Sequence, residues 1–518
     1  MEKNALLAIV LSLAVLILYQ FFFAPPPPKV TEKEPPATEK EIATVQPETS
    51  APEIVTPDAG IEERPRFDAI ADREIHVEND LYTAVLSSRG ASVKYWSLKT
   101  YKDEQGDNVV LLRAPGEVPA VAIGSNKEFN LASVNFRVSG GDLVLDSANS
   151  SGSIRFDYAG DNFSVRRTYT FYANTYKVHL TDEVSGLPHY WITVGSDFGI
   201  FDKKAGYSHV GPAVLTGTDL EELKPNKLKE MKVFTENLKW IAQEDKYFFA
   251  ALAPVETPVL EARAWTFEDS PIIAFKGTPD RNTFILYAGP KEHDALKQVG
   301  VGLEHIIDFG FFSVLSRPLF WLLKWFYSFM GNYGWAIVLL TIVTRLPFIP
   351  IVNKGQKSMK KLQAIQPKMA EIKEKYKKDP QKMQKEMTGL YKKHKVNPVS
   401  GCLPMLIQLP VFFALYKVLL VAIELRGAPF LLWITDLSAK DPYYILPVVM
   451  GLTMLLQQKM TPSGMDPRQA KMMLLMPVVF TFLFLNFASG LVLYWLVNNI
   501  LGIAQQFFVN RKITKEPA

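Results

Sequence analysis

The feature that most constrains this chain is a run of about 20 apolar residues, 333–352, that contains one charge, Arg345. A helix of this length crosses a hydrocarbon core of about 30 Å, so the run predicts a membrane span. An arginine inside such a span costs about 2.5–3.5 kcal/mol on insertion scales. We therefore expect Arg345 to face a partner or a water-filled cavity inside the protein. Thr341 lies four residues earlier, on the same face of the helix.

The two halves of the chain differ in charge. Residues 4–305 carry 30 Lys and Arg against 42 Asp and Glu, whereas residues 306–518 carry 26 against 10. This asymmetry predicts an acidic soluble domain followed by a basic membrane domain. The one cysteine, Cys402, excludes an intramolecular disulfide framework and zinc sites built on several cysteines.

The first 66 residues predict a membrane anchor and a tether. Residues 1–24 are interpreted as an uncleaved signal anchor, because their apolar stretch is long and no A-x-A cleavage site follows it. The alternative is a cleaved signal peptide. Residues 25–66 contain ten prolines among Glu, Thr, Lys and Ala, a composition that cannot bury a core. They predict a semi-extended linker.

Residues 67–305 alternate apolar and polar side chains in short segments bounded by Gly, Asn and Asp. Many such segments with few helical stretches predict a large antiparallel β-sandwich. The six histidines of this region are scattered, and no H-E-x-x-H or paired-carboxylate motif is present. A sugar-binding cleft lined by Tyr and Trp stays an alternative, although aromatic residues in strands usually form core or cross-strand pairs.

A short amphipathic helix is predicted between the sandwich and the Arg345 run. Residues 306–331 place Arg317 and Lys324 seven apart, hence on one helix face, among many aromatic residues. A narrow cationic stripe with abundant aromatic side chains is typical of a helix that lies in the membrane interface.

A basic hairpin is predicted directly after the Arg345 run. Residues 353–400 carry 14 lysines, and apolar residues recur there at three- and four-residue steps. Asp379 and Pro380 indicate the N-cap and first turn of a second helix. Lysines this close to spanning helices belong in the cytoplasm. The hairpin could contact anionic lipid, ribosomal RNA or an acidic partner.

The remaining apolar segments complete a six-span topology. The predicted spans are 402–424, 442–458, 472–487 and 490–508, and a basic tail follows at 509–518. If the N-terminus lies in the cytoplasm, a topology of six spans places every Lys and Arg cluster in the cytoplasm, as the positive-inside rule requires. We therefore predict a polytopic α-helical membrane protein with five spans in one bundle, both termini in the cytoplasm and the β-sandwich outside.

The second half has no Walker motif, nucleotide fingerprint or cysteine cluster, so we predict neither an enzyme nor a cofactor or metal site. A polar groove around Arg345 would lower the free energy of moving polar client segments past lipid. Burial of the client helix, at about 0.8 kcal/mol per CH₂, would drive the transfer. The candidate polar neighbours of Arg345 are Thr341, Gln408, Tyr416, Tyr494, Asn498 and Gln505. The alternatives are an anion channel or transporter that uses Arg345, and a membrane-tethered periplasmic carbohydrate-binding module.

Four stretches of the second half resemble the YidC-type membrane protein insertases. They are LLTIVTRLPFIP (339–350), CLPMLIQLPVFFALYKVL (402–419), PYYILPVVMGLTMLLQQKMTP (442–462) and MPVVFTFLFLNFASGLVLYWLVNNILGIAQQ (476–506). The first half resembles the periplasmic β-sandwich of the family's Gram-negative branch in layout. The resemblance implies an insertase and folding chaperone of the bacterial inner membrane, acting alone or with the Sec translocon. Its implied partners are nascent membrane proteins, the ribosome and membrane lipids, with no small-molecule substrate expected.

By position, the resemblance makes Arg345 the cation of the groove and Thr341 its neighbour. Tyr494 and Trp495 would line the client path on the last helix, where the family often has two tyrosines and Trp495 departs from that pattern. The predicted client-binding set is Arg345, Thr341, Gln408, Tyr416, Tyr494, Trp495 and Asn498. The basic hairpin corresponds to a mobile hairpin implicated in client recruitment, with Lys360, Lys361, Lys368, Lys377, Lys378, Lys392 and Lys393 as its candidate residues.

Overall fold

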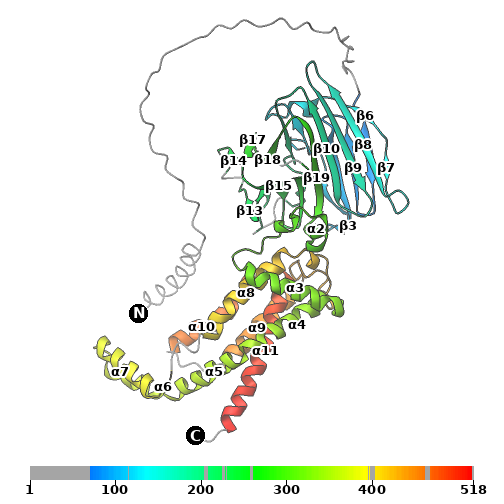
Figure 1. The fold of residues 1–518 in the computed structure, drawn as a ribbon. Helices are drawn as coiled ribbons and strands as arrows, with labels where there is room; N and C mark the ends of the chain where they lie inside the picture. Colours follow the sequence, from blue (N-terminus) through cyan, green and yellow to red (C-terminus); the bar gives the residue numbers. More distant parts are fainter. Residues whose placement is uncertain are drawn as a thin grey trace, which may run out of the picture. The chain divides into compact units, whose positions relative to one another are not determined.

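Strands come first in the described chain and helices follow (Figure 1). The computed structural model describes residues 71–515 apart from Pro115, 203–207, 225–227, Lys229, 257–258, Leu260, Lys395, 397–402 and 461–466. The predicted anchor, 1–24, and linker, 25–66, lie outside the described residues.

The described strands form one nine-stranded sheet and two five-stranded sheets. The nine-stranded sheet consists, in spatial order, of β13 (Asp219–Glu222), β12 (Gly211–Thr216), β15 (Leu238–Glu244), β16 (Phe248–Pro254), β19 (Asp280–Pro290), β10 (Lys177–Ser185), β9 (Ser164–Tyr172), β8 (Ser151–Ala159) and β6 (Arg137–Ser139). One smaller sheet contains β4 (Asn108–Leu112), β3 (Ser92–Lys102), β2 (Tyr82–Ser87), β1 (Glu74–Glu78) and β7 (Leu143–Val144). The other contains β14 (Lys232–Phe234), β17 (Ala262–Phe267), β18 (Ser270–Gly277), β11 (Tyr190–Thr193) and β5 (Ile123–Gly124).

Alternating burial explains why these segments are strands. In β9 every second side chain from Val165 to Phe171 is buried, and β10 alternates in the same way. One face of each strand therefore packs into a common core, whose largest buried members include Trp96 and Trp240. The predicted β-sandwich is confirmed.

A buried ion pair connects two central strands of the large sheet. Arg167 of β9 donates to both carboxylate oxygens of Asp182 in β10. Its Nε donates to Oδ1 at 2.7 Å, and its Nη2 donates to Oδ2 at 2.9 Å. Both side chains are 0% exposed. Arg167 Nη1 also donates to the main-chain oxygen of Val121 at 2.5 Å, so this one side chain ties strand pairing to a neighbouring loop.

Glu244 makes the stability of the sandwich depend on pH. Its side chain lies buried at the end of β15, with Lys291 as its ion-pair partner. Burial raises the pKa of Glu244 to about 7, and the attraction of Lys291 offsets only part of that rise. Because this pKa in the folded protein exceeds the ordinary value of 4.5 for a Glu side chain in water, Glu244 stabilises the fold at low pH. The contribution is lost as the pH rises through about 7.

We expect the difference in melting temperature, wild type minus Glu244→Gln, to increase as the pH falls from about 8 to about 5.5. Burial lowers the pKa of His179 and His209, so these residues titrate in the opposite sense. They are present in both proteins, and the difference in melting temperature isolates Glu244. Scanning calorimetry of the two proteins across this pH range checks the prediction, and a pH-independent difference would contradict it.

The helical part follows the last strand. Its helices are α2 (His293–Val299), α3 (Ser313–Met330), α4 (Tyr333–Arg345), α5 (Ile349–Ala364), α6 (Gln366–Lys375), α7 (Pro380–Lys393), α8 (Leu403–Val421), α9 (Ile445–Met460), α10 (Pro467–Phe484) and α11 (Ser489–Lys515). A 3₁₀ turn, Leu346–Phe348, joins α4 to α5. The predicted N-cap is confirmed, since the Asp379 side chain accepts a hydrogen bond from the Lys382 amide at the start of α7. The predicted break in the last apolar region is confirmed between α10 and α11.

Two helical segments among the described residues are long and apolar enough to cross a membrane, Tyr333–Ala364 and Ser489–Arg511. Three shorter apolar helical segments accompany them, Gln408–Val421, Ile445–Met460 and Leu474–Phe484. The helical C-terminal region is thus confirmed, and the count of six spans stays a prediction.

Helix α3 has two distinct faces. Phe320, Leu323 and Phe326 are buried, whereas Trp321 and Trp325 are more than half exposed. Of the two residues of the predicted cationic stripe, Arg317 is exposed and Lys324 is half-buried. Lys324 pairs with Asp294 of α2 at 2.5 Å and lies 3.8 Å from Glu424. An uncovered aromatic face is typical of an interfacial helix, and that location stays a prediction.

Candidate functional site

Arg345 lies at the end of α4, and its guanidinium reaches α11. Nη1 donates to the main-chain oxygen of Asn498 at 2.6 Å and to its side-chain oxygen. Nη2 donates to Oε1 of Gln505 at 3.4 Å, a long hydrogen bond. Another face of α4 is apolar and buried, and it includes Ile337 and Leu340. The packing of this face fixes the orientation of α4 and thereby the position of the Arg345 side chain.

A chain of hydrogen bonds extends from this guanidinium in both directions. On one side, Gln505 Nε2 donates to Asn353 Oδ1 of α5 at 2.8 Å. On the other side, Asn498 Nδ2 donates to the hydroxyl of Tyr494 at 3.2 Å, which also accepts from Gln408 Nε2 of α8 at 2.7 Å. Polar groups of α4, α5, α8 and α11 are therefore connected across the bundle.

The charge of Arg345 is not neutralised by these contacts. Each acceptor of an Arg345 hydrogen bond is a neutral amide or carbonyl oxygen, and among the described residues no carboxylate forms an ion pair with Arg345. Its Nε atom is buried and has no hydrogen-bond partner in the described part of the chain. Burying a charge without a counter-charge is costly, so this guanidinium favours water or an incoming anionic group.

The structure separates the other predicted site residues from this chain of hydrogen bonds. Thr341 is buried, and its hydroxyl donates to the main-chain oxygen of Ile337 in its own helix at 2.7 Å. Tyr416 lies between aromatic rings of α8 and of the α10–α11 turn. Trp495 packs on Phe412 at 4.8 Å between ring centroids, and on Phe484 at 5.3 Å. Of the predicted polar neighbours, Asn498 and Gln505 thus accept hydrogen bonds from Arg345 directly, and Tyr494 and Gln408 are connected to it through Asn498.

Asn353 is a member of the hydrogen-bonded chain that the sequence did not indicate. The sequence predicts a span that ends at residue 352 and places Asn353 in the basic segment. The helix instead continues through the Leu346–Phe348 turn into α5, which keeps Asn353 within reach of Gln505. The sequence contains one indication that the helix continues, because no glycine or charged residue lies between Arg345 and Asn353.

The opposite end of α4 is covered by the loop of residues 426–444. Phe430 lies against Gly334, where an added Cβ would come within 2.0 Å of the ring. Asn332 donates to the main-chain oxygen of Pro429 at 3.0 Å, and the Gly490 amide donates to that of Leu437 at 2.8 Å. The loop therefore packs on the starts of both α4 and α11, away from Arg345.

The basic hairpin presents most of its lysines to solvent. Leu362, Ile365 and Met369 pack with Leu390 and Tyr391 in a small apolar core. The candidate lysines on the outside, all exposed, are Lys361, Lys368, Lys377, Lys378, Lys392 and Lys393. Lys360 is half-buried and donates to the main-chain oxygen of Asn510 on α11 at 3.4 Å.

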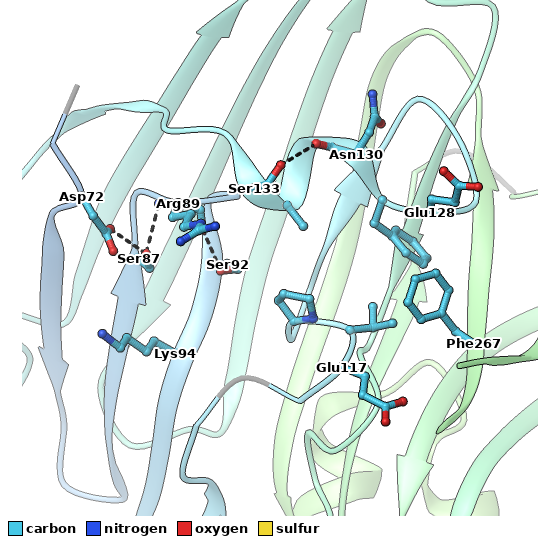
Figure 2. Close-up of a pocket in the computed structure, with 14 residues that line it drawn as sticks. Asp72, Ser87, Arg89, Ser92, Lys94, Glu117, Glu128, Asn130, Ser133 and Phe267 are labelled. Carbon is cyan, nitrogen blue, oxygen red and sulfur yellow. Dashed lines mark hydrogen bonds between the residues drawn. The ribbon is translucent and has the colours of Figure 1, made fainter. Parts of the chain in front are cut away.

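A pocket of about 470 Å³ lies in the sandwich (Figure 2). Arg89 and Lys94 stand on one side of it and Glu117 and Glu128 on the other. Burial alone would raise the pKa of Asp72, but hydrogen bonds from Ser87 and Ser88 lower it below its usual value. Asp72 therefore favours its ionised form. Among the described residues, no group of His, Cys, Asp and Glu could hold a metal ion.

Comparison with known proteins covers nearly the whole chain. A family model described as "60Kd inner membrane protein" matches residues 325–516, and one described as "YidC periplasmic domain" matches residues 74–322. The chain is 41% identical over 546 residues to "Membrane protein insertase YidC" of Geotalea daltonii, covering 99% of this chain and 100% of the relative. It is 40% identical over 553 residues to the protein of that description from Syntrophus aciditrophicus, with the same coverage. A solved structure described as an active YidC insertase covers 87% of this chain and 94% of its own, at 20% identity and a TM-score of 0.39.

Proposed function

The chain belongs to the YidC family of membrane protein insertases, and from that premise we propose that it moves client segments through a polar groove centred on Arg345. It is an inner-membrane protein with a periplasmic β-sandwich domain, its clients are nascent membrane proteins, and it is not an enzyme. The observation that carries the proposal is a partly buried guanidinium that, among the described residues, is held only by neutral partners.

The proposed mechanism is a temporary exchange of partners. A client arrives with a short polar tail and an apolar helix. The tail leaves bulk water for the groove, where Arg345 and the linked amides of Asn498 and Gln505 supply hydrogen bonds. The apolar helix moves into lipid, and its burial at about 0.8 kcal/mol per CH₂ drives the transfer without another energy source.

The proposed client contacts extend beyond the guanidinium. Arg345, Asn498, Tyr494 and Gln408 form the polar centre, and Trp495 and Tyr416 offer aromatic surface beside it. Thr341 would act only when its helix bond to Ile337 opens. The seven candidate lysines of the basic hairpin are proposed to recruit clients.

The proposed topology has six spans with both termini in the cytoplasm. Four spans are assigned to the apolar helices α8, α9, α10 and α11, and one to the Arg345 helix. The first span falls on residues 1–24, outside the described chain. Helix α3 is proposed to lie in the interface, with Trp321 and Trp325 toward lipid. The Sec translocon, the ribosome and membrane lipids are proposed partners.

Photo-crosslinking of a stalled nascent chain tests the proposed path. We expect a probe at Thr344 or Trp495 to crosslink the client, because both positions lie within one turn of the polar centre. A probe at Val314, which is 83% exposed on α3, serves as the control and should give little product. Equal crosslinking at all three positions would contradict a defined path beside Arg345.

A further inference from the structure

The loop between α8 and α9, residues 426–444, exposes two leucines at its tip. Leu431 is 46% exposed and Leu432 is 87% exposed. The backbone of Leu432 has a φ of 55°, in the left-handed region that is costly for a bulky side chain. In the described chain after residue 306, Tyr444 of this same loop is the only other non-glycine residue with a positive φ. Strain of this kind persists only where the surrounding structure enforces it, and it often marks a functional segment.

A buried carboxylate enforces the conformation of the tip. Oδ1 of the buried Asp441 accepts hydrogen bonds from the indole nitrogen of Trp433 at 3.0 Å and from the Tyr443 amide at 2.9 Å. The amide of Ile434, whose side chain is buried, donates to the main-chain oxygen of Leu431 at 3.1 Å and so closes a tight turn. These contacts hold the turn that leaves the two leucines outside the bundle. Their exposure is therefore a defined feature of the fold.

The contacts at the two ends of the loop show where the tip lies. At its start, the guanidinium of Arg426 lies over the rings of Phe201 and Phe248 of the sandwich, at 5.8 and 5.4 Å from their centroids. The loop is therefore on the periplasmic side of the bundle. At its end it enters α9, whose apolar Ile445 and Leu452 are exposed. Exposed apolar side chains on a helix of a membrane protein face lipid, so the loop lies where lipid meets periplasmic water.

The side chains around the tip are those of a membrane interface. Trp335 of α4 is exposed and packs at 5.4 Å on Phe430, the residue that precedes the two leucines. Tyr443 and Tyr444 are exposed, and the ammonium of Lys440 lies 6.0 Å from the ring centroid of Tyr444. Trp, Tyr and Lys side chains place an apolar body toward lipid and a polar end toward water. This composition favours a lipid surface as the occupant of the exposed tip.

We propose that Leu431 and Leu432 insert into the periplasmic leaflet of the inner membrane and anchor the loop to the bilayer. Burial of the leucine side chains among acyl chains offsets the strained backbone that presents them. Because the loop packs on the starts of α4 and α11, the anchor sets the depth of both helices in the membrane. The inference concerns the outer end of the bundle and does not depend on the role of Arg345.

Spin labels in the full-length protein test the surroundings of the tip. The label is attached at Leu431→Cys or Leu432→Cys, each combined with Cys402→Ser, in vesicles of phosphatidylethanolamine and phosphatidylglycerol. The reference positions are two exposed apolar residues, Val144→Cys on β7 for water and Phe482→Cys on α10 for lipid. We expect collisions with a water-soluble nickel complex to be about fivefold rarer at both leucines than at Val144, because lipid excludes polar solutes. Collisions with oxygen should match those at Phe482.

The two collision rates separate the possible occupants of the tip. Frequent nickel collisions at both leucines, as at Val144, would place the tip in water and overturn the inference. Rare collisions with both nickel and oxygen would mean that protein covers the tip, either a second copy or another segment of this chain, and would overturn it equally.

A substitution that keeps the turn but removes the apolar group is a second test. Asparagine tolerates a left-handed φ, so Leu432→Asn should preserve the loop while it weakens the anchor. We expect nickel collisions of a label at Leu431→Cys to increase by about threefold in this background, since one of the two inserted side chains is lost. Leu432→Met keeps an apolar side chain and serves as the matched control, with no expected change. Equal collision rates in the Asn and Met backgrounds would contradict insertion of Leu432.

Discussion

Replacement of Arg345 by alanine is expected to reduce insertion of clients with acidic translocated tails by about tenfold or more. A hydrogen bond to a charged group contributes about 1.5–3 kcal/mol, and about 1.4 kcal/mol corresponds to a factor of ten. Clients with neutral tails should insert nearly as well as with the wild type, because they never use the charge. The reconstituted rate for matched Asp and Asn tails measures the effect.

Arg345→Lys separates charge from geometry. Lysine keeps the positive charge but lacks the planar edge that binds a carboxylate through two hydrogen bonds. We therefore expect it to restore part of the loss, with a remaining deficit confined to acidic tails. Arg317→Ala removes an exposed arginine of α3 and should leave both clients unaffected. Equal loss for acidic and neutral tails would contradict a charge-based role. Loss of solute flux with insertion intact would instead support a channel.

The protein fold tolerates the loss of this charge. The partners of Arg345 are amides and carbonyls that water can satisfy, and no ionised partner is left behind among the described residues. Removing a guanidinium from a partly buried site also removes its desolvation penalty. We expect the melting temperature of Arg345→Ala to stay close to that of the wild type, so that lost insertion reports on function.

The position of the site could be predicted from the sequence because a lone charge in an apolar run has few physical solutions. Asn498, Tyr494 and Gln408 are candidates for the same reason, being polar residues in apolar helices, and they form one chain of hydrogen bonds that ends at Arg345. The hydroxyl of Thr341 could not be assigned, since a threonine in a helix can bond to its own backbone instead.

The sequence predicts the β-sandwich as a fold class, but it does not predict the order in which the strands pair. Period-two burial is a local property, and it marks β9 and β10 directly. The pairing of β19 with both β10 and β16 is a long-range choice that no local pattern encodes. The inward position of Arg167 was equally hidden, because the alternation rule expects an apolar residue between Val165 and Tyr169.

The largest effect on stability is expected from Arg167→Ala. Removing one partner of a fully buried ion pair leaves Asp182 charged and unpaired in the core, which costs about 3–5 kcal/mol. The main-chain oxygen of Val121 loses a donor as well. The neighbouring Arg166→Ala is a matched control, because its side chain is 53% exposed on the opposite face of β9. An exposed ion pair contributes no more than about 1 kcal/mol. Hydrogen exchange of the β9 and β10 amides in the full-length protein measures both changes.

Arg167→Ala also tests which part of the chain inserts clients. Every residue of the hydrogen-bonded chain around Arg345 described above comes from α4, α5, α8 or α11, and none comes from a strand. A sandwich that opens more often should therefore leave insertion of both Asp and Asn clients within about twofold of the wild type. Faster exchange throughout β9 and β10 with insertion intact is the expected outcome. If insertion falls in proportion to the loss of protection, and Arg166→Ala changes neither, the sandwich takes part in insertion directly and the helical bundle is not sufficient.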